Sequence, residues 1–360
     1  MDSIFELSEQ GFGVHTFEIK FNHMTQEEYH TIKDRIIRIS EKDKEDKCLI
    51  VKTHSKSGIR IKLYKNNPFP PYLTVIVNPS TMLGFDDPHS ILKSFNKCRL
   101  KEALDEKLKS YLGYKFGIER FQLTRIDCTV DFIMSSPELS SYYIKLVSKS
   151  IRLNASSDTF GFYEDNAAPY NDNISERDKH CFRVTQNGYY SLTVYDKLYD
   201  LINKGYLDNR TVKNGLLRFE IALMYRKINE VKASLNTEDI IELVSYFTKN
   251  AENILKMQLK NKIVSGNYYK ISKIYDLLQV PAHKSAAAQR LATLYSLNNK
   301  FCTYNDLKKD ALDRFGKYKL RDIEDLRKQL NTSPAVLPDY CSYDVLPGIY
   351  DMFDIDRNDK

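Results

Sequence analysis

Three short segments of the chain carry chemically reactive side chains at every second position. They span residues 123–132, 190–197 and 217–223. Because side chains alternate between the two faces of a β-strand, each segment is predicted to be a strand with one apolar and one polar face. The side chains expected on the polar faces are those of Arg125, Asp127, Thr129, Asp131, Thr193, Tyr195, Lys197, Arg218 and Glu220.

If these strands share a sheet, their polar face suits phosphoryl transfer. A phenol has a pKa of about 10, so Tyr195 needs a nearby metal ion or ammonium group to act as a nucleophile at neutral pH. Lys197 lies two residues further on and therefore on the same face. A metal would also withdraw charge from the phosphate oxygens. The set favours metal-assisted chemistry with a tyrosine nucleophile, and the plain alternative is a polar face that only meets solvent.

Other tyrosines and the histidines are alternative candidates for these roles. Most of the 25 tyrosines are expected to be packing residues, and Tyr199, one helical turn after Tyr195, is the second candidate nucleophile. The seven histidines include no H-x-H pair and no H-E-x-x-H motif, so a metal would be bound mainly by carboxylates, which favours Mg²⁺ or Mn²⁺ over Zn²⁺. Alternation places His15 on the apolar side of its strand, where we expect a core or edge residue.

Composition sets broad limits on function. The 360 residues are 42% hydrophobic, which is enough for a proper core, and the net charge of +6 permits nucleic-acid binding without requiring it. Six scattered cysteines without a C-x-x-C pair favour a reducing cytoplasm. The sequence shows no P-loop motif, no signal-peptide pattern and no run of about 18 apolar residues, so we expect neither a P-loop ATPase nor a membrane protein.

The first 230 residues mix strands and helices, which predicts an α+β fold with a mixed or antiparallel sheet. Further strands are expected at 13–22, 48–53, 58–65, 72–78 and 159–163, and helices after Thr25, over 99–113, from Pro137 and from about residue 198. The order strand–helix–strand–strand occurs near 13–65 and again near 121–196. It suggests a duplicated, ferredoxin-like unit, although no repeat of residues accompanies it.

The remainder of the chain has apolar residues at helical spacing. Helices are expected at 237–260, 268–279, 284–297, 304–315 and 319–330. The predicted domains are therefore an α+β catalytic domain over 1–230, an α-helical domain over 231–335 and an acidic C-terminal arm over 336–360. A turn containing Gly316 joins the last two helices, which is compatible with a helix-turn-helix motif, but a plain helical hairpin is favoured because such hairpins are more common.

Five pieces of the sequence, in their order and approximate spacing, resemble a known family. They are residues 58–64 (GIRIKLY), 75–83 (VIVNPSTML), 125–127 (RID), 192–197 (LTVYDK) and 215–220 (GLLRFE). Together they resemble the replication initiators of filamentous phages, the gene-two and gene-ten family of phage and plasmid replication proteins. A more distant likeness reaches the initiators of staphylococcal plasmids, which also carry Arg-Ile-Asp, Tyr-Asp-Lys and Arg-x-Glu strands.

The resemblance implies a nicking–joining enzyme of rolling-circle replication. In that family a tyrosine cuts one strand at the origin, keeps the 5′ end as a phosphotyrosine and rejoins the ends without ATP. By resemblance Tyr195 is the nucleophile, Lys197 an active-site cation, and Asp127 and Glu220 are ligands of Mg²⁺ or Mn²⁺. Asp131 is added as a third metal ligand, although the phage members keep no acid there.

The implied partners are single-stranded and duplex origin DNA, with a host helicase as a further candidate, in the cytoplasm of a bacterial host. DNA contacts are expected from Arg125 and Arg218 in the sheet and from Lys300, Lys308 and Lys309 in the helical region, where phosphate contacts position the protein. Two alternatives stay open: a non-catalytic origin-binding protein that uses the sheet as a platform, and a mobilisation relaxase with the same chemistry at a transfer origin.

Overall fold

The computed structural model describes residues 4–22, 24–39, 42–45, 48–51, 57–64, 70–85, 90–163, 180–208, 213–279, 285–297 and 303–356. The elements of the first half are β1 (Phe5–Leu7), β2 (Gly13–Phe21), α1 (Gln26–Ile39), β3 (Lys42–Glu45), β4 (Cys48–Val51), β5 (Ile59–Tyr64), β6 (Tyr72–Val77), α2 (Pro79–Met82), α3 (Lys97–Leu112), η1 (Ile118–Arg120), β7 (Gln122–Met134), α4 (Pro137–Lys149) and β8 (Asp158–Phe162). The elements that follow are β9 (Cys181–Gln186), β10 (Tyr190–Asp196), α5 (Lys197–Asn203), β11 (Gly215–Met224), α6 (Tyr225–Leu235), α7 (Ile240–Lys262), β12 (Asn267–Lys270), α8 (Ile271–Gln279), α9 (Ala286–Ser296), α10 (Tyr304–Phe315), α11 (Lys317–Gln329), β13 (Thr332–Leu337), β14 (Val345–Leu346) and α12 (Ile349–Met352).

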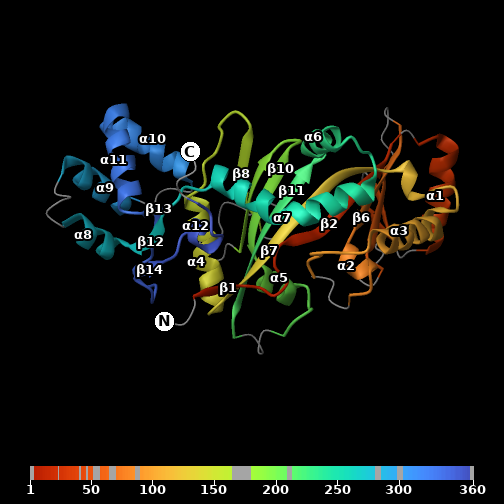
Figure 1. The fold of residues 1–360 in the computed structure, drawn as a ribbon, viewed down its shortest axis with the longest axis horizontal. Helices are drawn as coiled ribbons and strands as arrows, with labels where there is room; N and C mark the ends of the chain where they lie inside the picture. Colours follow the sequence, from red (N-terminus) through yellow and green to blue (C-terminus); the bar gives the residue numbers. More distant parts are fainter. Residues whose placement is uncertain are drawn as a thin grey trace.

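One large antiparallel sheet dominates this α+β fold (Figure 1). Within the described residues it has 11 strands in the order β3-β4-β5-β6-β2-β7-β11-β10-β9-β8, and β1 pairs with the end of β7. The three strands singled out for their chemistry, β7, β11 and β10, are direct neighbours in it. The sequence did not predict β9, which lies in a polar stretch that reads as a loop. Residues 164–179 of that stretch lie outside the described residues.

The sheet consists of two halves with the same topology. In the first half, β2 and α1 are followed by the meander β3-β4-β5-β6, and β6 returns to pair with β2. In the second half, β7 and α4 are followed by β8-β9-β10-β11, and β11 returns to pair with β7. The halves join where β2 pairs antiparallel with β7. The expected duplication is therefore present, but its unit is a strand, a helix and a four-stranded meander rather than a ferredoxin-like fold.

Helices cover the apolar face of the sheet. Helix α7 packs on β2 and β7, and α4 packs on strands of the second half. Figure 1 shows α7 crossing in front of the sheet. The α7 side chains of Leu243 and Phe247 belong to one core with Val130 of β7 and Phe219 of β11. The opposite face of β7, β10 and β11 carries the polar side chains.

A second, smaller core lies among the last helices. Helices α8, α9, α10 and α11 pack around Leu291, Leu294 and Ile323, beside a small sheet of strand order β13-β12-β14. Figure 1 shows these helices at one end of the molecule, with α1 and α3 at the other. The five helices expected after residue 230 are all present. Helix α6 and the small sheet, whose strands are at most six residues long, were not predicted.

The packing differs from the expected domain boundaries at two places. Helix α7 was assigned to the helical domain, yet it completes the core of the large sheet. The acidic arm expected over 336–360 also returns to that core, where Ile349 and Phe353 are each 2% exposed. Acidic residues alternate with large apolar ones in this segment, and the apolar ones are buried. The chain therefore forms part of the first core, then the second core, and finally returns to the first.

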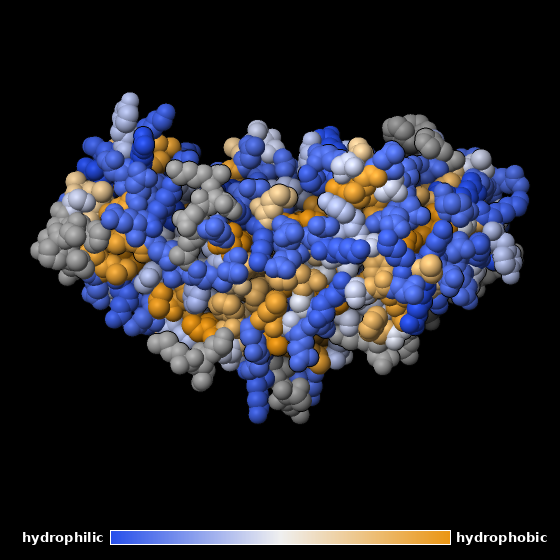
Figure 2. Space-filling view, in the orientation of Figure 1, coloured by the Kyte–Doolittle hydropathy of each residue, from blue (hydrophilic) through white to orange (hydrophobic). Residues whose placement is uncertain are grey.

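The face of the molecule seen in Figure 2 is mostly hydrophilic, with hydrophobic residues gathered in patches along its lower middle part. Among the described helices, none is both long enough and apolar enough to cross a membrane.

Candidate active site

Strand register brings the predicted polar side chains onto one patch of the sheet. Tyr195 of β10 lies opposite Arg218 of β11, which in turn lies opposite Asp131 of β7. Two residues further along β11, Glu220 lies between Thr193 of β10 and Thr129 of β7. After two more residues, Ala222 of β11 lies opposite Asp127 of β7. The predicted face is thus confirmed strand by strand, because all these residues share one phase of the alternation.

Arg218 and Asp131 form a buried ion pair at the centre of the patch. The guanidinium Nε and Nη2 donate to the two carboxylate oxygens of Asp131 at 2.6 Å each, and Arg218 is 1% exposed. Burial opposes the charge on Arg218, but the Asp131 carboxylate more than compensates and raises its pKa. Both Asp131 oxygens accept from the buried guanidinium of Arg218, so Asp131 would have to share its carboxylate with that arginine to act as the predicted metal ligand. Arg218 is likewise turned to Asp131 rather than to a DNA phosphate.

Asp127 and Glu220 form a pair of buried carboxylates beside this ion pair. Arg125 Nε donates to one oxygen of Asp127 at 2.7 Å, and the Thr16 hydroxyl donates to the other. Arg125 Nη2 also lies 3.8 Å from Glu220. Burial, and then the negative charge of Asp127, raise the pKa of Glu220. Arg125, with a side chain 39% exposed, is therefore the group that now neutralises the two acids.

This pair satisfies part of what a hard cation requires. Carboxylate oxygens are the preferred ligands of Mg²⁺ and Mn²⁺, and a divalent ion would relieve the repulsion between Asp127 and Glu220. In the part of the chain that the structure describes, no three His, Cys, Asp or Glu side chains are arranged to hold a metal as they stand. A metal at this site would be held by Asp127 and Glu220 and would compete with the Arg125 guanidinium for these two acids.

His15 lies on this polar face, not on the apolar face where alternation placed it. Its Nδ1 is 4.0 Å from a Glu220 oxygen. The register of β2 against β7 shifts between Val14 and Phe17, so His15 and Thr16 both turn toward the polar side while Val14 and Phe17 are buried. The sequence holds a signal for this β-bulge, because Val14 is out of phase with Phe17, Ile19 and Phe21.

Tyr195 and Lys197 lie close together but are deeply buried. Tyr195 is 6% exposed, and this burial raises the pKa of its phenol well above the ordinary value, although Arg218 acts in the opposite direction. Lys197 Nζ lies 5.8 Å from the centre of the Tyr195 ring and 2.8 Å from Asp200. Burial, with help from the positive charge of Arg218, lowers the pKa of Lys197 to about 8.

Tyr199, the second candidate nucleophile, lies on α5 just beyond the patch. Its ring stacks on His180 at 3.6 Å between centroids, with an angle of 11° between the planes. Its backbone N–H donates to Asp196, which caps α5 and whose pKa burial raises to about 6. Tyr199 is more accessible than Tyr195, but it is not in the strand register that brings Tyr195 opposite Arg218.

The lysines assigned to DNA binding are far from this patch in the fold. Lys308 and Lys309 are exposed on α10, and Lys300 lies outside the described residues. Helices α10 and α11 meet at Gly316, whose φ of 79° suits a sharp turn between them. The expected two-helix arrangement is present, and its role in DNA recognition stays a prediction.

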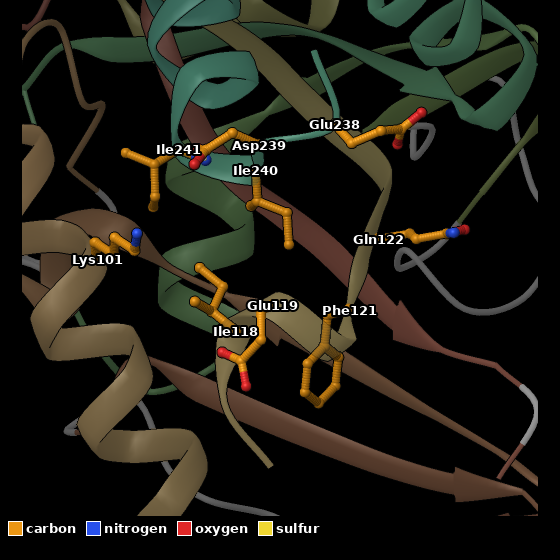
Figure 3. A pocket seen from close by; sticks show the side chains of 9 residues that line it. All are labelled: Lys101, Ile118, Glu119, Phe121, Gln122, Glu238, Asp239, Ile240 and Ile241. Atoms are coloured by element: carbon orange, nitrogen blue, oxygen red, sulfur yellow. The ribbon is translucent and has the colours of Figure 1, made fainter.

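A cavity lies elsewhere, between α3, η1 and the start of α7 (Figure 3). It is open to solvent and encloses about 400 Å³. Its lining residues are Lys101, Ile118, Glu119, Phe121, Gln122, Glu238, Asp239, Ile240 and Ile241. None of the predicted site residues is among them, so the candidate site is a patch on the sheet rather than this cavity.

Comparisons with known proteins give one likeness to report. No protein-family model matches the chain, and no curated protein sequence matches it. Among solved structures, the chain is similar to a rolling circle replication initiator protein from Geobacillus stearothermophilus. The likeness covers 70% of this chain and 86% of that one, with 11% identity and a TM-score of 0.33. At those values it assigns no function to this chain.

Proposed function

We propose that this protein nicks and rejoins one strand of DNA through Tyr195, in the manner of a rolling-circle replication initiator, with Mg²⁺ or Mn²⁺. The observation that carries the proposal is the strand register of β7, β11 and β10. It brings a tyrosine, a buried arginine and a pair of buried carboxylates onto one patch of a sheet face, and Lys197, the first residue of α5, lies buried beside Tyr195. The resemblance found in the sequence implies the same chemistry for these residues.

In the proposed reaction the Tyr195 oxygen attacks a backbone phosphorus and the bond from phosphorus to the 3′ oxygen breaks. The phenol loses its proton, the leaving 3′ oxygen gains one, and the 5′ phosphate stays on Tyr195 as a phosphodiester. Rejoining reverses these steps, so the bond energy is kept and no ATP is needed. The positive charge of Arg218 favours the phenolate, which burial disfavours. In the proposed reaction Lys197 supplies a second positive charge.

Asp127 and Glu220 would hold the metal ion, and His15 adds an imidazole next to Glu220. When bound, the ion would supply charge neutralisation at the phosphate oxygens. Asp131 is not part of this proposed set, because its arginine partner Arg218 is 1% exposed and fixed, whereas Arg125, the partner of Asp127, is 39% exposed. Arg125 is half-exposed, so it can leave the carboxylates and contact the DNA backbone instead.

The decisive test is a covalent adduct between the protein and a labelled single-stranded oligonucleotide from the origin of the element that encodes it. We expect a shifted band on a denaturing gel for the wild type and for Tyr199→Phe, and none for Tyr195→Phe. An adduct that persists in Tyr195→Phe and disappears in Tyr199→Phe would move the nucleophile to α5. No adduct in any variant, with DNA binding retained, would favour the non-catalytic alternative, which the low exposure of Tyr195 also favours.

Metal dependence has its own test. We expect EDTA to stop adduct formation, and Asp127→Asn and Glu220→Gln each to lower its rate by orders of magnitude, because an amide keeps the shape but not the charge that holds a hard cation. Mn²⁺ binding followed by electron paramagnetic resonance gives a readout independent of catalysis. Unchanged Mn²⁺ affinity in both variants would remove these residues from the metal site.

A further inference from the structure

The first half of the sheet carries its own cluster of cations and aromatic rings. The cluster, here named the first-half patch, consists of Lys20 on β2, Arg60, Lys62 and Tyr64 on β5, and Tyr72 on β6. Tyr64 and Tyr72 stack at 4.5 Å between ring centres with 15° between planes, and Lys20 Nζ lies 3.9 Å from the centre of the Tyr72 ring. Neither the reaction nor the proposed metal uses any of these residues.

The first-half patch faces the same side of the sheet as the candidate active site. Lys20 and Lys62 both lie opposite Thr74 of β6, which places all three on one face. On that face Glu18 lies opposite Arg125 of β7, the residue that contacts Asp127. The polar surface therefore runs without a break from β10 to β5.

The internal duplication makes this patch the counterpart of the active site. The register of each half matches the other position by position. Through it, Tyr64 corresponds to Tyr195, Tyr72 to Arg218, Thr74 to Glu220, Lys62 to Thr193, Arg60 to Ser191 and Glu18 to Asp127. The first half thus keeps a tyrosine at the position of the nucleophile. It lacks the acid that would pair with Glu18, and it has two cations where the second half has two hydroxyls.

We propose that the first-half patch binds the phosphodiester backbone of the single strand that passes through the candidate active site. The patch is a non-cleaving copy of that site, and this proposal rests on the proposed function. Among the described residues no ion pair involves Lys20, Arg60 or Lys62, although the charge of Lys62 acts on the nearby carboxylate of Glu18. The charges of Lys20 and Arg60, and part of that of Lys62, are therefore available to phosphates. Stacked tyrosines interleaved with cations are typical of surfaces that bind single-stranded nucleic acid.

The dimensions suit one continuous strand. Five strand spacings of about 4.8 Å separate Tyr195 on β10 from Tyr64 on β5, so a strand that contacts both tyrosines spans about 24 Å across the sheet. A backbone that advances about 3.4 Å per nucleotide covers this in about seven nucleotides, and a more extended one in fewer. Arg125 on β7, next to β2, provides a further contact along the same path.

The test compares two triple variants with the same change in charge. The patch variant is Lys20→Gln, Arg60→Gln and Lys62→Gln. The control variant is Lys101→Gln, Lys107→Gln and Lys249→Gln on α3 and α7, which cover the opposite face. Binding of fluorescein-labelled (dT)24 and of a 24-base-pair duplex is measured by anisotropy over a range of salt concentrations. Circular dichroism and thermal unfolding check that both variants fold, and Arg60→Gln alone serves if the triple variant does not.

For (dT)24 the logarithm of the binding constant falls linearly with the logarithm of the salt concentration. We expect the patch variant to reduce the magnitude of this slope by about 2, because three phosphate contacts are lost at about 0.7 each. The control variant should leave that slope unchanged. Equal slopes for both variants, no binding of (dT)24 by the wild type, or a larger effect on the duplex would each overturn the proposal. The binding assay does not involve Tyr195. A flatter salt dependence in the patch variant, together with no covalent adduct in the wild type, would therefore contradict the proposed nicking but support DNA binding by the first-half patch.

Discussion

The ion pair between Arg218 and Asp131 shows how single residues organise the candidate site. Replacing a buried ion pair by apolar residues often changes stability little, but removing one partner leaves an unpaired buried charge and costs about 3–5 kcal/mol. The pair also joins β7 to β11 directly beside Tyr195. The pair therefore fixes β7 against β11 and places a positive charge opposite Tyr195, and the predicted contacts of Asp131 with metal and of Arg218 with DNA stay predictions.

The lowered pKa of Lys197 predicts how nicking depends on pH. If its ammonium stabilises the phenolate of Tyr195, the rate should fall as pH rises through about 8, where Lys197 loses its proton. The phenol itself does not titrate in this range, because burial raises its pKa well above 10. Lys197→Arg should keep the charge and move the fall to higher pH. The measurement is the initial rate of adduct formation from pH 6.5 to 9.5.

A rate that instead rises through about pH 8 in the wild type would reverse the role of Lys197. The neutral amine would then be accepting the proton of the phenol, and Lys197→Arg would be inactive at every pH. Whether the rate falls or rises through about pH 8 therefore tells whether Lys197 acts as a cation or as a base, and it requires no assumption about how the DNA is bound.

For single residues, the sequence predicted which face of the sheet a side chain lies on, but not which side chain it contacts. Period-two alternation placed Asp127, Asp131 and Glu220 on one face correctly. It could not show that Arg218 engages Asp131 while Arg125 engages Asp127, because that choice depends on cross-strand register. It also failed at His15, where a bulge of one residue reverses the phase of the strand.

At the scale of elements, the order of strands and helices was largely predictable, and the pairing of strands was not. Long periodic segments such as α7 and β7 were recognised. Strand β9 was missed because it lies in a polar stretch, and β12 and β14, with four and two residues, are too short to show a period. The similarity of the two halves is carried by topology and register, and no repeat of residues reveals it. Their matching positions became visible only when β5 could be aligned with β10 through β6 and β11.

Helix α7 is the element that most directly supports the sheet beneath the site, and its N-cap is testable. Asp239 accepts hydrogen bonds from the backbone N–H groups of Ile241 and Glu242 at 2.8 and 2.9 Å. Asp239→Ala should lower the free energy of unfolding by about 1 kcal/mol, because two N–H groups lose their partner. Asp239→Asn keeps the acceptor and is the matched control. Urea unfolding that shows equal losses for both variants would mean that charge, not capping, is what Asp239 supplies.

At the scale of the whole molecule, the chain leaves the first core and then returns to it. After α7 it builds the second core from α8 to α11, and its final segment comes back to the large sheet. Composition suggested a boundary near residue 230 because helices dominate beyond it. Composition cannot show which core a helix joins, and both α7 and the C-terminal segment contribute side chains to the first core.

The return of the C-terminal segment predicts that the catalytic region does not fold without it. Phe353 is 2% exposed, and its ring lies 5.0 Å from both Phe132 of β7 and Phe219 of β11, between centroids. Phe353→Ala should therefore destabilise the protein by about 3–5 kcal/mol through the cavity it leaves. Tyr114→Ala, at a residue 90% exposed, is the control and should change stability by no more than about 0.5 kcal/mol.

A chain ending near residue 235 lacks both α7 and Phe353, so it should be insoluble or unfolded by circular dichroism. A soluble fragment of that length that still forms the covalent adduct would show that β7, β10 and β11 hold the site without the helices that cover them.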